Sequence, residues 1–312
     1  MADVHVQKSF AATGGVLYVV GTPIGHLDDF TRRAQSVLAS VDLIAAEDTR
    51  VTRKLLQAYG IRTPLVSFHA HSGPGRLQAL VERLVSGASV ALVTDAGMPA
   101  ISDPGEVLVR AAIRAGIPVV PIPGPSAAIA ALSVSGLPAT PFLFVGFLPR
   151  RPAERRERLA ALKPLPFTLV FYEAPHRLPA TLRDLVDVFG PRSAVVAREM
   201  TKRHETFWRG RLPDLWALAE KEPPRGEITL VVEGAEAADG RRAAPAGGAP
   251  AGEESPGAET PAEALRALLA AGFSGRDAAR AVAERFGLSR RTAYRLLADL
   301  DRSGALIRED ED

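Results

Sequence analysis

The segment at residues 94–105 has the composition of a ligand-binding loop. Its sequence, TDAGMPAISDPG, holds two glycines, two prolines and two aspartates between an apolar run typical of a strand and a run with helical spacing. Long loops built from glycine and proline at the carboxyl end of a strand are common ligand sites in open α/β sheets. The alternative is ordinary turn chemistry, in which Asp95 and Asp103 only cap neighbouring elements.

Two shorter loops could contact the same ligand. Residues 121–126 (PIPGPS) follow the next predicted strand, and Ser126 stands where a helix would present backbone N–H groups and a hydroxyl. Residues 21–25 (GTPIG) form a tight turn after a buried apolar run. The chain contains neither a G-x-G-x-x-G segment nor a Gly-Lys-Ser/Thr segment, which argues against the dinucleotide and P-loop fingerprints.

Charged residues at predicted strand ends are candidates for acid–base chemistry and phosphate binding. Glu47 and Asp48 follow one strand, and neighbouring side chains of an extended segment point in different directions. One of the two could therefore contact substrate while Asp48 caps the helix that follows. Arg50 and Arg53 could hold phosphates, and Lys202 could polarise a hydroxyl group. The residue types leave the choice of a general base open.

A metal site is not expected. His69 and His71 form an H-x-H pair, but no H-E-x-x-H framework accompanies it, and contact with a loop or with substrate is the expected role. The chain has no cysteine, which excludes a disulfide framework, an iron–sulfur cluster and a thiolate nucleophile.

The elements around these loops predict two α/β domains and a helical tail. Over residues 14–138, short apolar runs alternate with helical ones, which predicts a mostly parallel sheet. Residues 139–235 predict a second α/β domain with a mixed sheet. Residues 236–261, rich in Ala, Gly, Pro and Glu, predict a flexible linker. Residues 262–304 predict a helix–turn–helix-like RNA-binding module, with a plain helical hairpin as the alternative.

Positive charge is concentrated in clusters along the chain. The 312 residues are 46% hydrophobic and 24% charged, with a formal net charge of +2. Basic residues gather at 150–158, 198–211 and 290–295, which favours a polyanionic partner, with solvated surface as the alternative for each cluster. The chain shows no signal peptide and no uncharged apolar run of about 18 residues, so we expect a cytoplasmic protein with no membrane partner.

Six short segments, in this order and at this spacing, resemble those of a known enzyme family. They are GTPIG at 21–25, AEDTR at 46–50, GMPAISDPG at 97–105, PGPS at 123–126, FYEAPHR at 171–177 and REMTK at 198–202. The chain resembles the tetrapyrrole-methylase-fold enzymes and, more narrowly, the bacterial ribosomal RNA small subunit methyltransferase I family. The resemblance covers about residues 14–234. It implies S-adenosylmethionine as methyl donor and the ribose 2′-oxygen of a cytidine in the decoding region of 16S rRNA as acceptor.

The resemblance also implies where the ligands bind. The fold it implies is two α/β domains with the donor in the cleft between them, no metal, a homodimer, and 16S rRNA within the 30S subunit as partner. The implied donor-binding residues are Pro23, Asp95, Ala96, Gly97, Met98, Ile101, Ser102, Ser126, Ala127, Tyr172, Glu173 and Thr229. The catalytic candidates, taken from the polar residues at strand ends that would face this cleft, are Glu47, Glu173 and Lys202. The implied substrate-binding residues are Asp48, Arg50, Arg53, His176, Arg177, Arg198 and Arg203.

Two other functions fit part of the sequence. A tetrapyrrole methylase of the corrin or sirohaem type would share the fold and the donor, but it leaves the helical tail unexplained. A ligand-sensing DNA-binding regulator would use the cleft as sensor and the tail as reader, and only the tail supports it.

Overall fold

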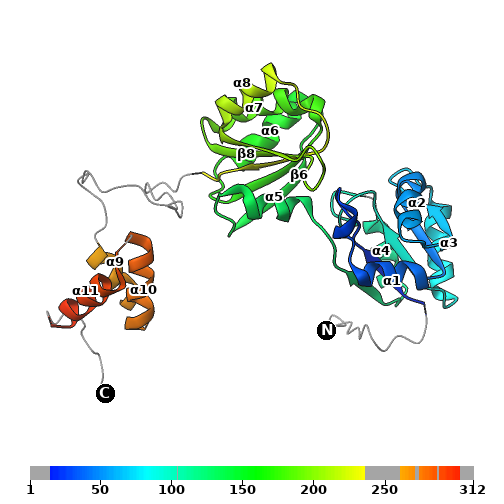
Figure 1. Ribbon diagram of the computed structural model, residues 1–312, viewed down its shortest axis with the longest axis horizontal. Coiled ribbons are helices and arrows are strands. Elements are labelled where there is room, and N and C mark those ends of the chain that lie inside the picture. Colours follow the sequence, from blue (N-terminus) through cyan, green and yellow to red (C-terminus); the bar gives the residue numbers. More distant parts are fainter. Residues whose placement is uncertain (1–14, 104, 236–260, 271–273, 287, 303–312) are drawn as a thin grey trace. The chain divides into compact units, whose positions relative to one another are not determined.

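The computed structural model describes most of the chain in two compact units, Met1–Arg242 and Ala243–Asp312 (Figure 1). The described residues are 15–103, 105–235, 261–270, 274–286 and 288–302. The predicted linker at residues 236–261 lies outside them, except for Pro261. Among the described helices, none is long and apolar enough to cross a bilayer.

The first lobe of the larger unit is built on a five-stranded parallel sheet. Its strands are β1 (Leu17–Val20), β2 (Leu43–Ala46), β3 (Leu65–Ser67), β4 (Val90–Val93) and β5 (Val119–Ile122). Their order is β3-β2-β4-β1-β5, and every neighbouring pair is parallel, which confirms the predicted sheet. The carboxyl ends of all five strands therefore meet at one edge.

Helices cover both faces of this sheet. The helices are α1 (Arg32–Ser40), α2 (Thr49–Ala58), α3 (Pro74–Val85) and α4 (Glu106–Arg114). Leu38 of α1 and Leu56 of α2 belong to the core on one face, and Leu84 of α3 and Leu108 of α4 belong to the core on the other. All residues of β4 are buried, which explains why its sequence shows no polar alternation.

The second lobe carries a mixed five-stranded sheet, as predicted. Its strands are β6 (Phe142–Phe147), β7 (Thr168–Glu173), β8 (Ser193–Arg198), β9 (Thr206–Arg211) and β10 (Ile228–Val232). The order is β6-β7-β10-β8-β9, with β6 and β7 parallel and the other pairs antiparallel. One face is covered by α6 (Pro152–Leu162), α7 (Leu178–Phe189) and α8 (Leu212–Lys221). Helix α8 was not predicted from the sequence.

The opposite face of this second sheet is covered by α5 (Ala127–Ser135). Ala131 and Leu132 of α5 pack against Val195 and Val231 of the sheet. The helix leaves the first lobe directly after β5, so its amino end starts at the carboxyl edge of the first sheet. The division at residue 138 stays a prediction, although α5 joins the core of the second lobe.

Part of the predicted basic cluster at residues 150–158 is buried. Arg155 is only 5% exposed, and its Nη2 lies 2.6 Å from Oδ2 of Asp184, itself 1% exposed. Arg156 donates from Nε to Oδ1 of the same carboxylate at 2.7 Å. The helical period places Arg155 on the face of α6 that carries Leu159, which packs on the sheet. This arginine is thus a core residue, and the cluster offers fewer cations to a polyanion than its sequence suggests.

The described residues of the second unit form three helices, α9 (Pro261–Ala270), α10 (Gly275–Phe286) and α11 (Arg290–Arg302). Leu265, Val282 and Leu300 are buried in its core, one from each helix. Ser289 caps α11 by accepting a hydrogen bond from the Thr292 N–H at 3.2 Å. The helical nature of this segment is confirmed, and its binding of RNA stays a prediction.

Removing the shared carboxylate should destabilise the second lobe. We expect Asp184→Ala to lower the free energy of unfolding by about 3–5 kcal/mol, because Arg155 then stays buried without a partner. The matched control is Arg156→Ala: this side chain is 54% exposed, and Asp184 keeps Arg155, so a loss below about 1 kcal/mol is expected. Chemical denaturation followed by tryptophan fluorescence measures both, since Trp208 and Trp216 lie in this lobe. Equal losses in the two variants would contradict the role given to the buried pair.

Candidate active site

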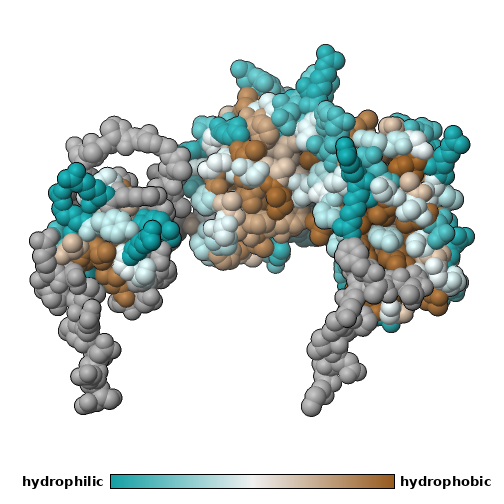
Figure 2. Space-filling view, turned by 60° about the horizontal axis from the view of Figure 1, so that its bottom comes forward, coloured by the Kyte–Doolittle hydropathy of each residue, from teal (hydrophilic) through white to brown (hydrophobic). Residues whose placement is uncertain are grey.

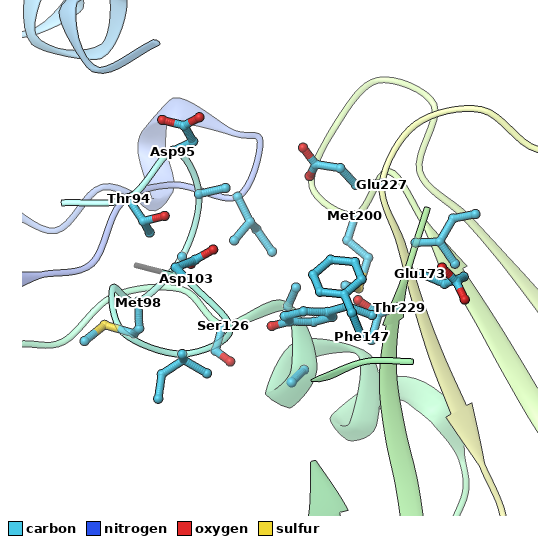
Figure 3. A pocket seen from close by; sticks show the side chains of 18 of the residues that line it. Thr94, Asp95, Met98, Asp103, Ser126, Phe147, Glu173, Met200, Glu227 and Thr229 are labelled. Carbon is cyan, nitrogen blue, oxygen red and sulfur yellow. The ribbon is translucent and has the colours of Figure 1, made fainter. Parts of the chain in front are cut away.

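A cavity of about 600 Å³ lies at the carboxyl edge of the first sheet, and the second lobe supplies its other wall (Figure 3). From the first sheet, the loops after β4 and β5 contribute Asp95, Gly97 and Ser126. From the second lobe, β7 contributes Tyr172 and β10 contributes Thr229. Both sheets therefore supply walls, as the cleft prediction requires.

Three loops are fastened together at the floor of this cavity. Thr22 and Gly97 exchange two backbone hydrogen bonds, of 2.9 and 3.1 Å, and the Thr22 hydroxyl donates to the Thr94 carbonyl at 3.1 Å. A Cβ added at Gly21 would lie 2.7 Å from the Cα of Gly124, so these two backbones meet with no space for a side chain. The loops after β1, β4 and β5 thus form one backbone surface that a ligand can approach closely.

The amino end of α5 opens into the cavity. Ser126 is its N-cap residue and has no side-chain capping bond, and Ala127 and Ala128 also line the cavity. Burial raises the pKa of the Tyr172 hydroxyl, which hydrogen-bonds the Ala128 backbone and the Ser126 side chain. Free N–H groups at a helix start favour an anionic group such as a carboxylate.

An acidic group also lines the cavity. Glu47, Asp95 and Asp103 line it together with Thr94, whose hydroxyl donates to Glu47 Oε2 at 2.5 Å. Burial, together with the negative charges of Glu47 and Asp95, raises the pKa of Asp103 to about 6, although a hydrogen bond with Thr94 opposes the shift. Burial also raises the pKa of Asp95, and the negative charge of the nearby Glu47 adds to this rise. Asp103 is therefore a carboxylate that exchanges its proton near neutral pH.

Asp48 follows Glu47 in the chain, but its carboxylate binds Arg50 at the start of α2. It caps α2 by accepting the Arg50 N–H at 2.8 Å, and its carboxylate pairs with the Arg50 guanidinium at 2.6 Å. The hydrogen bond from that guanidinium lowers the pKa of Asp48 to about 2. Of the two neighbouring acids, the structure thus directs Glu47 into the cavity and Asp48 to the helix.

Glu173 lies at the end of β7, with its side chain on the face opposite Tyr172. Its carboxylate accepts the Thr181 hydroxyl at 2.6 Å and the Ala174 N–H at 2.8 Å, and it lies 3.2 Å from Arg177 Nε. Figure 3 shows it on the far side of the strand from Phe147. Alternation along the strand turns the carboxylate of Glu173 away from the Tyr172 side, although Glu173, at the strand end, is also among the residues that line the cavity.

Lys202 does not line the cavity but lies behind its wall. Its Nζ is 2.9 Å from Glu199 Oε1 and 3.1 Å from Glu227 Oε2, and Glu227 does line the cavity. Burial opposes its charge, yet the hydrogen bonds with these two carboxylates prevail and raise the pKa of Lys202. The side chain is a fixed cation that orients Glu227.

The other predicted donor-binding residues, apart from Pro23 and Ser102, all line the cavity. Pro23 is buried beside Thr22 in the floor loop. Ser102 packs against the second lobe, where a Cβ on Gly146 would meet its hydroxyl at 2.9 Å. The residues that line the cavity as predicted are Asp95, Ala96, Gly97, Met98, Ile101, Ser126, Ala127, Tyr172, Glu173 and Thr229.

The predicted substrate-binding residues lie outside the cavity. Arg177 donates to the carbonyls of Leu148 and Pro149, at 2.8 and 3.1 Å, and Arg198 donates to the Thr206 hydroxyl at 3.1 Å. These two guanidinium groups hold the second lobe together. The exposed members of the set are Arg50, Arg53, His176 and Arg203.

The aromatic wall of the cavity was not predicted from the sequence. Phe144 and Phe147 approach the Tyr172 ring at 4.9 and 5.6 Å between centroids, and Phe147 is 55% exposed. Both belong to a segment that was interpreted only as a strand. A phenylalanine at each second or third position near the end of that strand was the available signal. In the described residues, no group of three or more His, Asp or Glu side chains is arranged to hold a metal ion.

Comparison with known proteins adds the family. The family model for Tetrapyrrole (Corrin/Porphyrin) Methylases matches residues 16–215. A protein of Synechocystis sp. named ribosomal RNA small subunit methyltransferase I is 46% identical over 93% of this chain and 100% of its own length. The protein of the same name from Halalkalibacterium halodurans is 44% identical, covering 90% of this chain and 94% of that one.

Solved structures share the fold. The uroporphyrin-III-C-methyltransferase from Thermus thermophilus is 26% identical with a TM-score of 0.51, covering 70% of this chain and 94% of that one. The methyltransferase CobJ is 23% identical with a TM-score of 0.56, covering 74% and 98%. Diphthine synthase, at 16% identity, has a TM-score of 0.53 and covers 70% and 90%.

Gly97 offers a test of the cavity floor. A Cβ at this position would lie 3.6 Å from the Pro125 carbonyl oxygen, so there is space for a side chain. Its φ of +85°, however, is a backbone conformation that residues other than glycine rarely adopt. We expect Gly97→Val to cost about 1–3 kcal/mol of backbone strain and to lower the affinity for S-adenosylmethionine, in calorimetric titration, by about tenfold or more.

The matched control for this substitution is Gly116→Val. Gly116 has a φ of +72°, a Cβ added to it would meet no atom within 4 Å, and it lies in the turn before β5, at the other edge of the sheet. The control variant should lose similar stability and keep its donor affinity. Equal donor affinities in the two variants would show that the donor does not bind over Gly97.

Proposed function

The chain belongs to the tetrapyrrole methylase family and, within it, to the ribosomal RNA small subunit methyltransferase I family, and from this premise we infer that it transfers a methyl group from S-adenosylmethionine to ribosomal RNA. The acceptor that we propose is the ribose 2′-oxygen of a cytidine in the decoding region of 16S rRNA. The observation that carries the proposal is the cavity itself, which combines a backbone floor, a helix amino end and an ionisable carboxylate. The names of the relatives favour RNA over a tetrapyrrole as acceptor.

The residues of the cavity fit the donor. A volume of about 600 Å³ is within the usual range for a small-molecule site. The N–H groups at the start of α5 suit a carboxylate, and the acidic side chains of Glu47 and Asp95 suit ribose hydroxyls and a positive charge. Met98 and Ile101 offer apolar surface to an adenine ring. When bound, S-adenosylmethionine supplies an electrophilic methyl group to an oxygen nucleophile.

We propose Asp103 as the group that accepts the proton of the ribose hydroxyl. A pKa of about 6 leaves most of this carboxylate ionised at neutral pH, yet makes it more basic than an ordinary aspartate. Thr94 donates to Glu47 and also hydrogen-bonds Asp103, but this contact offsets only part of the rise in the pKa of Asp103 that burial and the charge of Glu47 cause.

The three catalytic candidates from the sequence receive different proposed roles. Glu47 positions Thr94 and raises the pKa of Asp103. Glu173 is proposed as a positioning residue that fixes the turn after Tyr172, and Lys202 as one that orients Glu227. Glu47, Thr94, Asp103 and Glu227 are thus polar residues of these networks that line the cavity.

The aromatic wall suits an RNA acceptor. Phe147 is exposed at the cavity and lies against the Tyr172 ring, so one face of it is available to a base. Single-stranded RNA is commonly recognised by stacking of unstacked bases on aromatic side chains. We propose that Phe147 contacts the base of the acceptor nucleotide.

The finer partners are also proposals. Arg291 and Arg295 are exposed on α11 beside the exposed Tyr294, a combination suited to RNA, and support an RNA-binding role for the second unit. Val107 and Ile113 of α4 are more than half exposed, and Figure 2 shows apolar patches between the hydrophilic side chains of the surface. We propose that such patches are covered in a homodimer, and that the homodimer acts on the 30S subunit in the cytoplasm. Light scattering of the purified chain tests the dimer.

Labelled methyl transfer tests the function directly. The purified chain is incubated with methyl-labelled donor and, in parallel, 30S subunits, naked 16S rRNA or uroporphyrinogen, and the RNA is digested to nucleosides. We expect label in 2′-O-methylcytidine. Label only on a base, or only in the tetrapyrrole, would contradict the proposed acceptor.

The pKa of Asp103 predicts a pH dependence of the reaction. We expect kcat/KM to fall below about pH 6, by roughly tenfold per pH unit, because the protonated carboxyl cannot accept a proton. Asp103→Asn should lower the rate by about 10²–10⁴ and should abolish the fall of kcat/KM below about pH 6 (the acid limb of the profile), while donor affinity is retained. Asp95→Asn, the control in the same acidic group, should keep the limb. A limb that survives in Asp103→Asn would assign the proton to another group.

The same shift predicts an effect on stability. A carboxyl whose pKa is raised by folding contributes stability that is fully present below its ordinary pKa of 3.8 and is lost as the pH rises through about 6. Asp103→Asn should therefore raise the thermal unfolding midpoint relative to wild type at pH 7.5 and not at pH 3.5. A lower midpoint at pH 7.5 would indicate that Asp103 serves the fold instead.

A further inference from the structure

A second hollow lies at the same edge of the first sheet, outside the donor cavity. It measures about 500 Å³ and is lined only by polar or small residues: Ser67, His69, Ser72, Gly73, Gly75, Arg76 and Ala79. No acidic side chain lines it. It follows β3, so it belongs to the same row of strand ends as the acidic group of the donor cavity.

The strand order fixes how far this hollow is from the reacting carboxylates. β3 pairs with β2, and β2 pairs with β4. The pairing of β3 with β2 extends to the carboxyl ends of both strands, where the Phe68 N–H donates to the Ala46 carbonyl at 2.7 Å. Glu47 directly follows β2, and Thr94 directly follows β4. Neighbouring strands are about 4.8 Å apart, so the hollow begins about 10 Å from the Thr94 end of the row. That separation suits a nucleotide next to the one in the cavity.

The charged side chain that lines this hollow is the cation of Arg76. Arg76 is exposed and, among the described residues, has no ion pair, and Arg53 and Lys54 are exposed on the neighbouring α2, which contacts β3. His69 Nδ1 accepts the His71 N–H at 3.1 Å, which makes Nε2 the proton-bearing nitrogen of the neutral ring. His69 can therefore donate a hydrogen bond to an anion without being charged.

Two glycines keep the hollow open. Neither Gly73 nor Gly75 has a positive φ, and a Cβ added to either would meet no atom within 4 Å. Neither backbone conformation nor packing therefore requires a glycine at these positions. Gly75, in the first turn of α3, is a weaker helix former than most residues, and Gly73, at the N-cap, makes no side-chain capping bond. Their small size leaves room for close approach to Arg76.

We propose that this hollow binds a backbone phosphate of the RNA, on a nucleotide adjacent to the methylated one, through Arg76 and His69. The proposal rests on the proposed function, because it assumes an RNA acceptor in the donor cavity. A phosphate here would fix the register of the strand so that the acceptor ribose lies over Asp103, while the base contacts Phe147. Phosphate contacts set position without reading sequence.

The first test compares two exposed arginines near β3. Arg76 lies after the strand at the proposed site, whereas Arg62 precedes the strand, at the opposite edge of the sheet, and has no ion pair among the described residues. In the full chain, Arg76→Ala should raise the KM for 30S subunits about fivefold and reduce the slope of log affinity against log salt by about one. The kcat and the donor affinity should stay unchanged. Arg62→Ala should behave as wild type.

A second variant tests the phosphate site independently, in case Arg76→Ala changes the KM only slightly. Gly73→Asp places a carboxylate at the N-cap of α3, where aspartate is a favoured residue, so the thermal midpoint should equal or exceed that of wild type. The same carboxylate repels a phosphate, and we expect RNA affinity to fall by about tenfold or more. A stable variant with wild-type RNA affinity would overturn the proposal.

The outcomes separate this proposal from the function on which it rests. Wild-type enzyme that fails to methylate 30S RNA would refute the proposed function. Active wild type, with Arg76→Ala and Arg62→Ala alike in KM and salt slope, would refute only the phosphate site. A changed donor affinity in Arg76→Ala would also refute it, because the hollow would then serve the donor.

Discussion

The cavity depends on the approach of three loops to within backbone contact. Gly21 and Gly124 meet so closely that neither can carry a Cβ, and Thr22 and Gly97 are joined by a pair of backbone hydrogen bonds. These contacts exist because β1, β4 and β5 are adjacent parallel strands whose loops leave the sheet at the same edge. The shape of the cavity beside the acidic group is thus set by backbone geometry, and side chains only complete it.

Sequence patterns predicted the features that depend on local chemistry. Buried apolar runs separated by helical spacing predicted the first sheet correctly, because strands buried on both faces need no polar alternation. Gly97, Ser126 and Tyr172 were predicted through motifs, and all three line the cavity. Asp48 was correctly given a capping role as one alternative, because aspartate before a helix has a local partner in the N–H groups of the first turn.

Features that depend on distant partners could not be predicted in this way. Asp103 has the sequence context of a cap, and its raised pKa comes from burial and from Glu47, which lies far away in the chain. Lys202 was expected at the reacting group, but its pairing with Glu227 depends on how the loop after β8 meets the segment before β10. Arg155 belongs to a run of arginines, and only the packing of α6 decides that it is buried. In each case, tertiary contacts and not residue type determine the role.

The arrangement of charge along the sheet edge also separates the proposed phosphate contact from the carboxylates of the donor cavity. Asp103 has a raised pKa because the cavity is partly desolvated and already holds the negative charges of Glu47 and Asp95. A positive charge in this cavity lowers that pKa, whereas phosphates brought close to it raise the pKa further. Placing the phosphate contact two strands away, at a hollow with its own cations, limits the second effect through distance and local neutralisation. The sheet edge can thus bind a polyanion while the carboxylate that must accept a proton stays ionised.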